Sequence, residues 1–167
     1  MSPEERALAA VRAWVPRFTA GKARVYALLK PPLRDGERYG AKLVGVGISR
    51  VSAADPLGGL DVEQPVAGLA YGTSERLLVA HGTRVRHQWE WAQLSQVLVL
   101  PSYAGVVLRT GDESVDVVHR VRVPHDIWAA PEWKTAARWL ALEGCFAASR
   151  GRLDDWLERL PARVLAA

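Results

Sequence analysis

Closely spaced runs of strand-forming residues between positions 68 and 108 constrain the fold of this chain more than any other feature. A strand that ends near Thr73 is followed by RLLVAH (76–81), RVRHQWEW (84–91) and QVLVL (96–100). The connections between these runs are too short to hold the crossover helix that parallel neighbours require. The segment therefore predicts a meander of antiparallel strands.

The alternation of polar and apolar residues predicts which face of these strands is buried. In 84–91 one face carries Val85, His87, Trp89 and Trp91, and the other carries Arg84, Arg86, Gln88 and Glu90. The segment 114–123 repeats the pattern, with Val115, Val117, His119, Val121 and Val123 on one face and Asp116, Arg120 and Arg122 on the other, interrupted by Val118. Such a period of two indicates one face on a core and one in water, so we expect Trp89 and Trp91 to be buried.

Helical patterns flank the strands. Ser2-Pro3-Glu4-Glu5 is a capping-box start. Apolar residues then recur at helical spacing, at Leu8, Val11, Trp14, Val15 and Phe18. Pro16 is expected to kink or end this helix, and a second helical piece runs from 22 to 29. A helix that is apolar around most of its circumference runs from Pro131 to near Gly151, and a short one follows over 152–160.

Composition indicates a single globular domain. The chain has 167 residues and one cysteine, Cys145, which excludes an internal disulfide and a thiolate metal cage. No apolar stretch approaches the roughly 20 residues that span a bilayer, and the N-terminus lacks the pattern of a signal peptide. We expect a cytoplasmic protein, peripheral at the inner face of the membrane if it binds lipid. Arginine-rich composition without asparagine suggests a bacterial source with a GC-rich genome.

Positive charge is concentrated in the first third of the chain. Residues 1–50 contain ten Lys or Arg against four Asp or Glu, whereas residues 51–125 contain six against eight. An anionic partner is one interpretation, with the candidate contacts Lys22, Arg24, Lys30, Arg34, Arg38 and Lys42. A solvated basic face is the alternative, because no run of adjacent basic residues occurs.

The spacing of residues in 69–108 resembles that of bacterial pleckstrin-homology-like domains, including GRAM-like ones. The matching positions are Gly72-Thr73, Arg76-Leu77-Leu78-Val79, Trp89 and Trp91, Leu94 to Val97, and Gly105-Val106-Val107-Leu108, with Asp35-Gly36-Glu37 as the lead-in. The resemblance implies an α+β fold: a partly open, strongly bent antiparallel β-barrel of about seven strands, with a C-terminal capping helix. Trp133, Trp139 and Phe146 would then plug the barrel. We expect the barrel and capping helix in 33–150, with helical additions in 1–32 and 151–167.

No group of residues in the sequence forms a recognisable catalytic, cofactor or metal site. His87 and His119 share the expected inward phase and would meet if their strands were neighbours, but no third ligand has metal-site spacing. Gly45-Val46-Gly47 lacks the third glycine of a dinucleotide fingerprint. Asp154 and Asp155 are adjacent and therefore lie on different faces of a helix. We expect no enzyme activity, no cofactor and no metal, with an uncharacterised enzyme as a distant alternative.

Two functional classes are compatible with the sequence. The first is a protein-interaction or scaffold module, self-associating as a homodimer through aromatic residues of the terminal helices, namely Trp14, Phe18, Trp139 and Trp156. The second is a peripheral membrane module whose basic N-terminal third meets anionic headgroups. Nucleic-acid binding is disfavoured, because the tryptophans share the core phase of their strands instead of alternating with arginine on an exposed sheet.

Overall fold

Seven strands and three α-helices make up the fold seen in the computed structural model, which describes residues 1–14, 30–111, 113–122 and 131–166. The strands are β1 (Tyr39–Ser52), β2 (Gly68–Thr73), β3 (Arg76–His81), β4 (Arg84–Glu90), β5 (Gln96–Val99), β6 (Gly105–Arg109) and β7 (Ser114–Arg120). The helices are α1 (Pro3–Trp14), α3 (Glu132–Ser149) and α4 (Leu153–Ala166). Short 3-10 turns occur at Leu57–Gly59, Trp91–Gln93 and Pro101–Tyr103. The predicted α+β class is confirmed, whereas the helix expected over 22–29 lies outside the described residues.

The seven strands form one antiparallel sheet in the order β4-β3-β2-β1-β7-β6-β5. Each strand is a neighbour of the next one along the chain except β4 and β5, which lie at opposite edges. Strand β1 pairs with β2 through its first half and with β7 through its second. Register shifts interrupt the β1–β2 pairing, and Gly45 there has a left-handed φ of 65°. Glycine tolerates this backbone, and such irregularities bend a strand strongly. The sheet curves as a result but is not closed into a barrel, since β4 and β5 remain its two edges.

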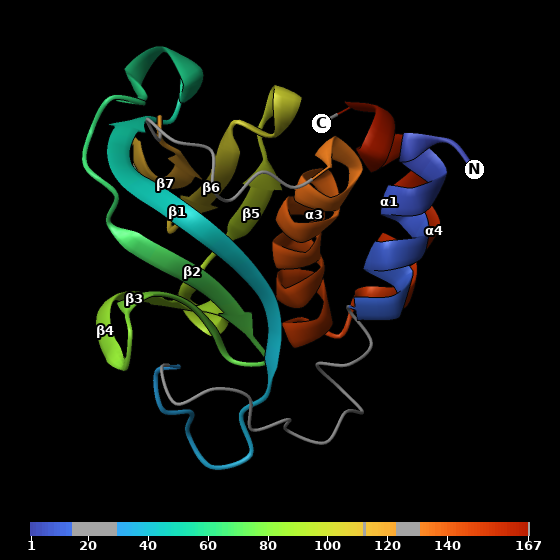
Figure 1. The fold of residues 1–167 in the computed structure, drawn as a ribbon, viewed down its shortest axis with the longest axis horizontal. Helices are drawn as coiled ribbons and strands as arrows, with labels where there is room; N and C mark the ends of the chain where they lie inside the picture. Colours follow the sequence, from blue (N-terminus) through green and yellow to red (C-terminus); the bar gives the residue numbers. More distant parts are fainter. Residues whose placement is uncertain (15–29, 112, 123–130, 167) are drawn as a thin grey trace.

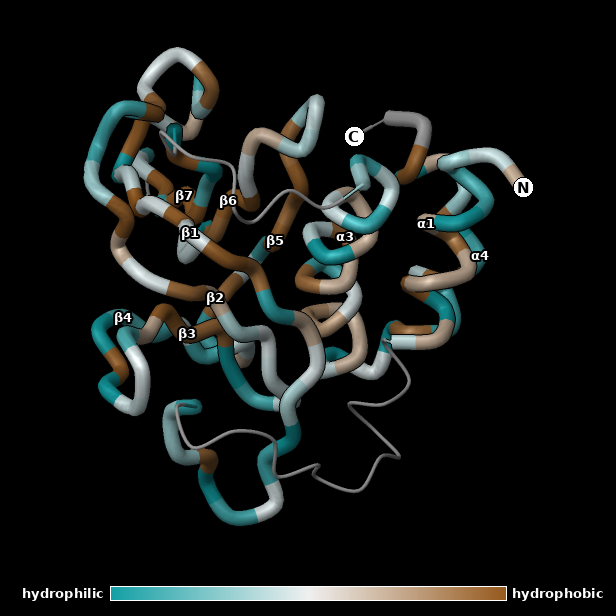
Figure 2. The backbone as a smooth tube through the Cα atoms, viewed as in Figure 1, coloured by the Kyte–Doolittle hydropathy of each residue, from teal (hydrophilic) through white to brown (hydrophobic). Residues whose placement is uncertain are grey.

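Helix α3 lies between the sheet and a pair formed by α1 and α4 (Figure 1). It contacts β1, β2, β5 and β6 on one side and both other helices on the opposite side. Figure 2 shows tan and brown segments of α3 alternating with teal ones along the helix. The broad apolar surface predicted for this helix is therefore covered within the same chain. In the described part of the chain, no helix combines the length and apolar character needed to cross a membrane.

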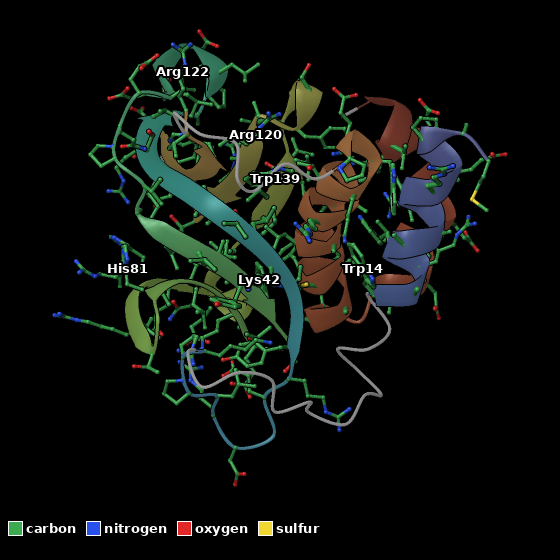
Figure 3. The ribbon with its side chains drawn as sticks, viewed as in Figure 1. Trp14, Lys42, His81, Arg120, Arg122 and Trp139 are labelled. Carbon is green, nitrogen blue, oxygen red and sulfur yellow. The ribbon has the colours of Figure 1, made fainter. Side chains whose placement is uncertain are left out.

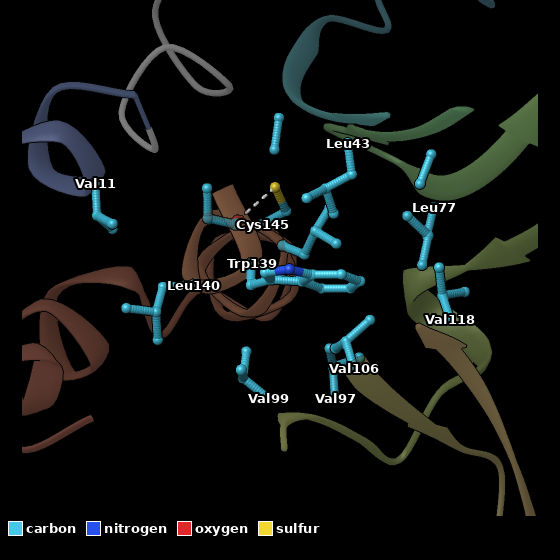
Figure 4. Packing of buried hydrophobic residues seen from close by; sticks show 14 of the residues in the cluster. Val11, Leu43, Leu77, Val97, Val99, Val106, Val118, Trp139, Leu140 and Cys145 are labelled. Carbon is cyan, nitrogen blue, oxygen red and sulfur yellow. Dashed lines mark hydrogen bonds between the residues drawn. The ribbon is translucent and has the colours of Figure 1, made fainter. Parts of the chain in front are cut away.

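Trp139 occupies the centre of the main core, between α3 and the concave face of the sheet (Figure 4). The side chain is 1% exposed and belongs to one cluster with Leu43, Leu77 and Val118 from three different strands. On the other side of α3, Leu140 faces Val11 of α1 (Figure 4). Trp139 is therefore a central packing residue between α3 and the sheet.

Local signals in the sequence account for both ends of the helices. At the start of α1, the Ser2 amide donates to Glu5 Oε2 (2.7 Å) and the Glu5 amide donates to Ser2 Oγ (3.1 Å), which is the predicted capping box. At the end of α3, Gly151 adopts a left-handed φ of 67°, and its amide and that of Arg152 bond back to α3 carbonyls. Helix α1 therefore begins, and helix α3 ends, where the sequence predicts.

The convex side of the sheet at β6 and β7 is also buried, which the sequence did not predict. Val115 and Val117 join Val51 in a second, smaller cluster, and partly buried Leu60 packs against it. His119 points to this same side and is fully buried, whereas Val118 points into the main core. The expectation that His119 shares the inward face of His87 is therefore wrong. His87 is itself exposed on β4.

Gly72 on β2 allows α3 to pack closely on the sheet. A Cβ at this position would lie 2.7 Å from Leu142 Cδ2 and 3.2 Å from Cys145 Sγ. Replacing Gly72 with alanine is expected to cost about 1–3 kcal/mol of unfolding free energy, because it overpacks this contact. Urea denaturation followed by circular dichroism measures the cost. In a Leu142→Ala background the same change should cost much less; an equal cost in both backgrounds would exclude this contact as the cause.

Candidate functional site

A groove of about 590 Å³ opens at one end of the helical layer, where α1, α3, α4 and the Pro101–Tyr103 turn converge. Its lining residues are Pro3, Glu4, Ala7, Ser102, Tyr103, Arg120, Glu132, Trp133, Thr135, Ala136 and Val164. The volume falls within the range of small-molecule and side-chain binding sites. This groove is therefore the leading candidate for a binding site in the described part of the chain.

The wall formed by Ser102 and Tyr103 has an unusual backbone. Both residues have positive φ angles, 56° and 51°, which side-chain-bearing residues adopt only at some energetic cost. The Tyr103 hydroxyl donates to the Val164 carbonyl oxygen at 3.0 Å and so ties this turn to α4. Half-buried Trp133 forms another part of the lining. Strained backbone of this kind occurs preferentially at ligand-binding positions.

The groove carries charges of both signs. Glu4 and Glu132 lie in the first turns of α1 and α3, and Arg120 is the last residue of β7 (Figure 3). Burial raises the pKa of Tyr103; the Arg163 charge lowers it and the Glu4 charge raises it further. The eleven lining residues include no histidine, cysteine or lysine. They offer a mixed surface, more polar than apolar, in which Tyr103 and Trp133 supply the aromatic part. Such a surface is suited to binding more than to proton transfer or nucleophilic attack.

Sequence reasoning missed this groove because its residues come from five separate elements. Trp133 was expected only as a barrel plug, and Arg120 only as a solvent-facing strand residue. The one local signal was Pro101-Ser102, a turn-forming pair between two strands. That signal marks a turn, and nothing in it indicates that the turn forms a wall beside two helix ends.

The aromatic residues predicted to form an interaction surface are mostly buried. Trp139 lies in the core and Trp156 is 8% exposed, so neither is available to a partner while the chain is folded as described. Trp14 is half-buried at the end of α1, and Phe18 lies outside the described residues. The prediction failed for Trp139 because the sheet covers it, and for Trp156 because α4 folds back onto α3.

Trp156 is held by a buried carboxylate that the sequence did not single out. Its Nε1 donates to Glu143 Oε1 at 3.0 Å, and the Arg163 guanidinium donates to both oxygens of Glu143. The Val99 amide on β5 donates to Glu143 Oε2 at 3.0 Å. Hydrogen bonding to Glu143 raises the pKa of Arg163. The cluster therefore joins α3 and α4 to an edge strand of the sheet.

The six basic residues predicted to contact an anionic partner fall into three groups. Lys22 and Arg24 lie outside the described residues. The Arg34 guanidinium donates to both carboxylate oxygens of Glu90, and the bond from Nη1 to Oε2 is 2.9 Å long. Arg34 Nη1 also donates to Glu75 Oε2 at 3.4 Å. The Glu90 bond raises the pKa of Arg34 and lowers that of Glu90. The charge of Arg34 is therefore already compensated within the chain.

The other three described basic residues lie around the start of β1. Arg38 donates its backbone amide to Ser74 Oγ at 3.0 Å. Lys30 and Lys42 have no ion pair with a described residue, and the charge of Lys42 acts on Lys30. Lys30 and Lys42 are thus the members of the predicted set that combine proximity with uncompensated charge.

Residues that carry the family resemblance meet in a buried polar cluster. Glu37 Oε2 accepts hydrogen bonds from Arg76 Nε (2.9 Å) and Thr73 Oγ1 (2.6 Å), and Glu37 Oε1 accepts one from Arg76 Nη2 (3.1 Å). Trp91 Nε1 donates to the Thr73 carbonyl oxygen at 2.7 Å. Burial alone would raise the pKa of Glu37, but the bonds from Arg76, Thr73 and the Arg34 amide outweigh it, so the pKa is lowered. This cluster fastens the segment before β1 onto the sheet.

The remaining titratable side chains have structural roles. His119 Nε2 lies 2.9 Å from Gln64 Nε2 and 2.8 Å from Ser49 Oγ, which holds the 53–67 connection against β1 and β7. Cys145 is buried, which raises the pKa of its thiol, and it donates to the Ala141 carbonyl oxygen. Within the described ranges, no three His, Cys, Asp or Glu side chains are arranged to hold a metal ion.

Neither a protein-family model, nor a curated protein, nor a solved structure gives a significant match to this chain.

Proposed function

We propose that this chain is a non-catalytic binding module with a pleckstrin-homology-like fold. The single antiparallel meander and the helix on its concave face support the likeness, as does the bonding between the motif residues Glu37, Thr73 and Arg76. Helices α1 and α4 both pack on α3. This packing supports treating 1–32 and 151–167 as additions to one domain at 33–150.

The hydrogen bonds of the two buried carboxylates, Glu37 and Glu143, favour a binding role over a catalytic one. Glu37 is held by Arg76 and Thr73, and Glu143 is held by Arg163, Trp156 and a backbone amide. Both carboxylates are committed to ion pairs that join elements of the fold. A general acid or base needs a carboxyl that can exchange a proton with a substrate.

The groove beside Ser102 and Tyr103 is the observation that carries the proposal. Its aromatic and aliphatic lining is flanked by Glu4, Glu132 and Arg120. An apolar anchor residue of a partner would pack on Trp133, and the flanking charges would orient the segment around it. The groove therefore suits a short segment of a protein partner. Self-association is the narrower form of this proposal, with a second copy supplying the segment.

Placing an arginine at Thr135 tests this function, because Thr135 is half-buried in the groove lining. Thr135→Arg should weaken partner binding about tenfold or more, since the new side chain occupies the anchor position. A partner is first captured from the native cell, and isothermal titration with the purified partner then measures affinity. Sedimentation velocity of the chain alone reports on a second copy.

Ser149→Arg is the matched control, because Ser149 is exposed at the opposite end of the same helix. This variant should bind as well as the unaltered chain. Equal loss of affinity in both variants, or unchanged affinity in Thr135→Arg, would rule out the groove as the binding site. Labelling with 5-fluorotryptophan adds a direct readout, because the Trp133 resonance should shift when partner is added.

A further inference from the structure

Two lysines approach each other at the start of β1. Lys42 projects from β1 between Ala41 and Leu43, whose side chains enter the main core, so Lys42 points to the opposite, convex side (Figure 3). Lys30 immediately precedes the segment that crosses this side of the sheet. Burial lowers the pKa of Lys30, and repulsion from Lys42 lowers it further. Lys42 is the cross-strand neighbour of Tyr71 on β2, and the Tyr71 ring packs against the Tyr39 ring over which Lys30 lies, so both lysines flank the same pair of tyrosines.

Tyr39 holds Lys30 in place. The Lys30 Nζ lies 4.9 Å from the centre of the Tyr39 ring, a distance that allows a cation–π contact. The Tyr39 hydroxyl donates to the Pro31 carbonyl oxygen, and its ring packs against Tyr71 with ring centres 5.6 Å apart. A lysine fixed in this way loses less conformational entropy when it binds a ligand than a free surface lysine does.

No carboxylate pairs with either lysine in the ranges that the structure describes. Arg34, a few residues away, shows the contrast, since Glu90 and Glu75 compensate its charge. The chain immediately before Lys30 adds no acid either, because residues 15–29 include three basic residues and no Asp or Glu. In the described part of the chain, no carboxylate therefore offsets the repulsion between Lys30 and Lys42.

We propose that Lys30 and Lys42 together bind a doubly charged phosphate group, either free or carried on a lipid headgroup. Such a group accepts hydrogen bonds from two ammonium groups at once and removes their repulsion. The site lies on the convex side of the sheet, away from the groove, and does not depend on the proposed function. Thr135→Arg should leave phosphate binding unchanged.

Two arms of one experiment separate the sources of phosphate. In the first, inorganic phosphate is titrated into the isotope-labelled chain at low salt, and amide chemical shifts are followed by NMR. In the second, the chain is sedimented with phosphatidylcholine vesicles that contain phosphatidic acid. We expect the amides of Lys30, Tyr39 and Lys42 to shift in the first arm. Co-sedimentation in the second arm would identify the headgroup as a source, and its absence would restrict the site to soluble phosphate.

Charge-matched variants decide whether the two lysines form a site. Lys30→Gln and Lys42→Gln should each weaken binding about fivefold, which corresponds to the usual contribution of one basic group near an anionic surface. Lys134→Gln removes the same charge from α3 and should have no effect. Equal weakening by Lys134→Gln would mean that net charge alone attracts the anion and would overturn the proposal. An absence of shifts in the first arm would overturn it as well.

Discussion

Replacing Arg76 with leucine is expected to lower the free energy of unfolding by about 3–5 kcal/mol, because it leaves the Glu37 carboxylate buried without its charged partner. The two side chains are 6% and 3% exposed, and two hydrogen bonds join them. Urea denaturation followed by circular dichroism measures the change. Replacing both residues with leucine should cost less than the sum of the single replacements. Additive costs would show that the pair is not coupled.

The ion pair between Glu37 and Arg76 also predicts how the free energy of unfolding depends on pH. The bonds in the folded chain outweigh burial and hold the pKa of Glu37 below its ordinary value of 4.5. When folding lowers the pKa of a carboxyl group, the ionised group stabilises the folded chain. This stabilisation is complete above the pKa that the group has in the unfolded chain, and it is lost as the pH falls through the pKa that the group has in the folded chain. The unaltered chain should therefore lose this contribution below about pH 4.5. In Arg76→Leu this acid dependence should shrink, because the partner that lowers the pKa of Glu37 is gone.

Replacing Trp139 with alanine should cost about 3–5 kcal/mol, because it opens a cavity where the helical layer meets the sheet. The Trp139 Nε1 has no hydrogen-bond partner in the described part of the chain, so the stabilisation comes from packing. Urea denaturation monitored by circular dichroism avoids the loss of a fluorophore. A cost below about 1 kcal/mol would contradict a core position for this residue.

Phenylalanine substitutions provide the matched comparison. Trp139→Phe also removes an unpaired buried N–H group, which offsets part of the lost packing. Trp156→Phe removes a donor from the buried Glu143 carboxylate instead. We therefore expect Trp156→Phe to lose more stability than its loss of buried area alone accounts for. If Trp139→Phe instead exceeded the stability loss expected from its lost buried area by more than Trp156→Phe did, the hydrogen bonding assigned to the two indole N–H groups would be wrong.

Local patterns predicted the elements of this fold well. The capping box at Ser2 and Glu5 formed as expected, and the helix expected from Pro131 to Gly151 is α3 (Glu132–Ser149). Trp91 is buried as expected, although it lies in a 3-10 turn just beyond β4. These features depend on residues only a few positions apart, so the sequence contains nearly all the information that determines them.

Features that depend on distant segments were predicted poorly. The pattern in 114–123 correctly put His119 on the opposite side from Asp116, but it could not say which side faces the helix. Both sides of β7 are in fact covered, one by the main core and one by the 53–67 connection. Trp139 and Trp156 were assigned to a partner surface because a pattern cannot show that the sheet covers one side of α3 and that α4 packs on another. The groove at Ser102 was missed for the same reason.

The contact of α1 with α3 and α4 also limits the order in which this chain can fold during synthesis. Residues 3–14 leave the ribosome early, but the surface on which they pack is formed by residues 132–166. The hairpins of β2, β3 and β4 need only local pairing and can form while synthesis continues. Until those residues are synthesised, the apolar face of α1, which carries Val11, has no surface to pack against. During this interval the exposed apolar face of α1 favours association with other chains.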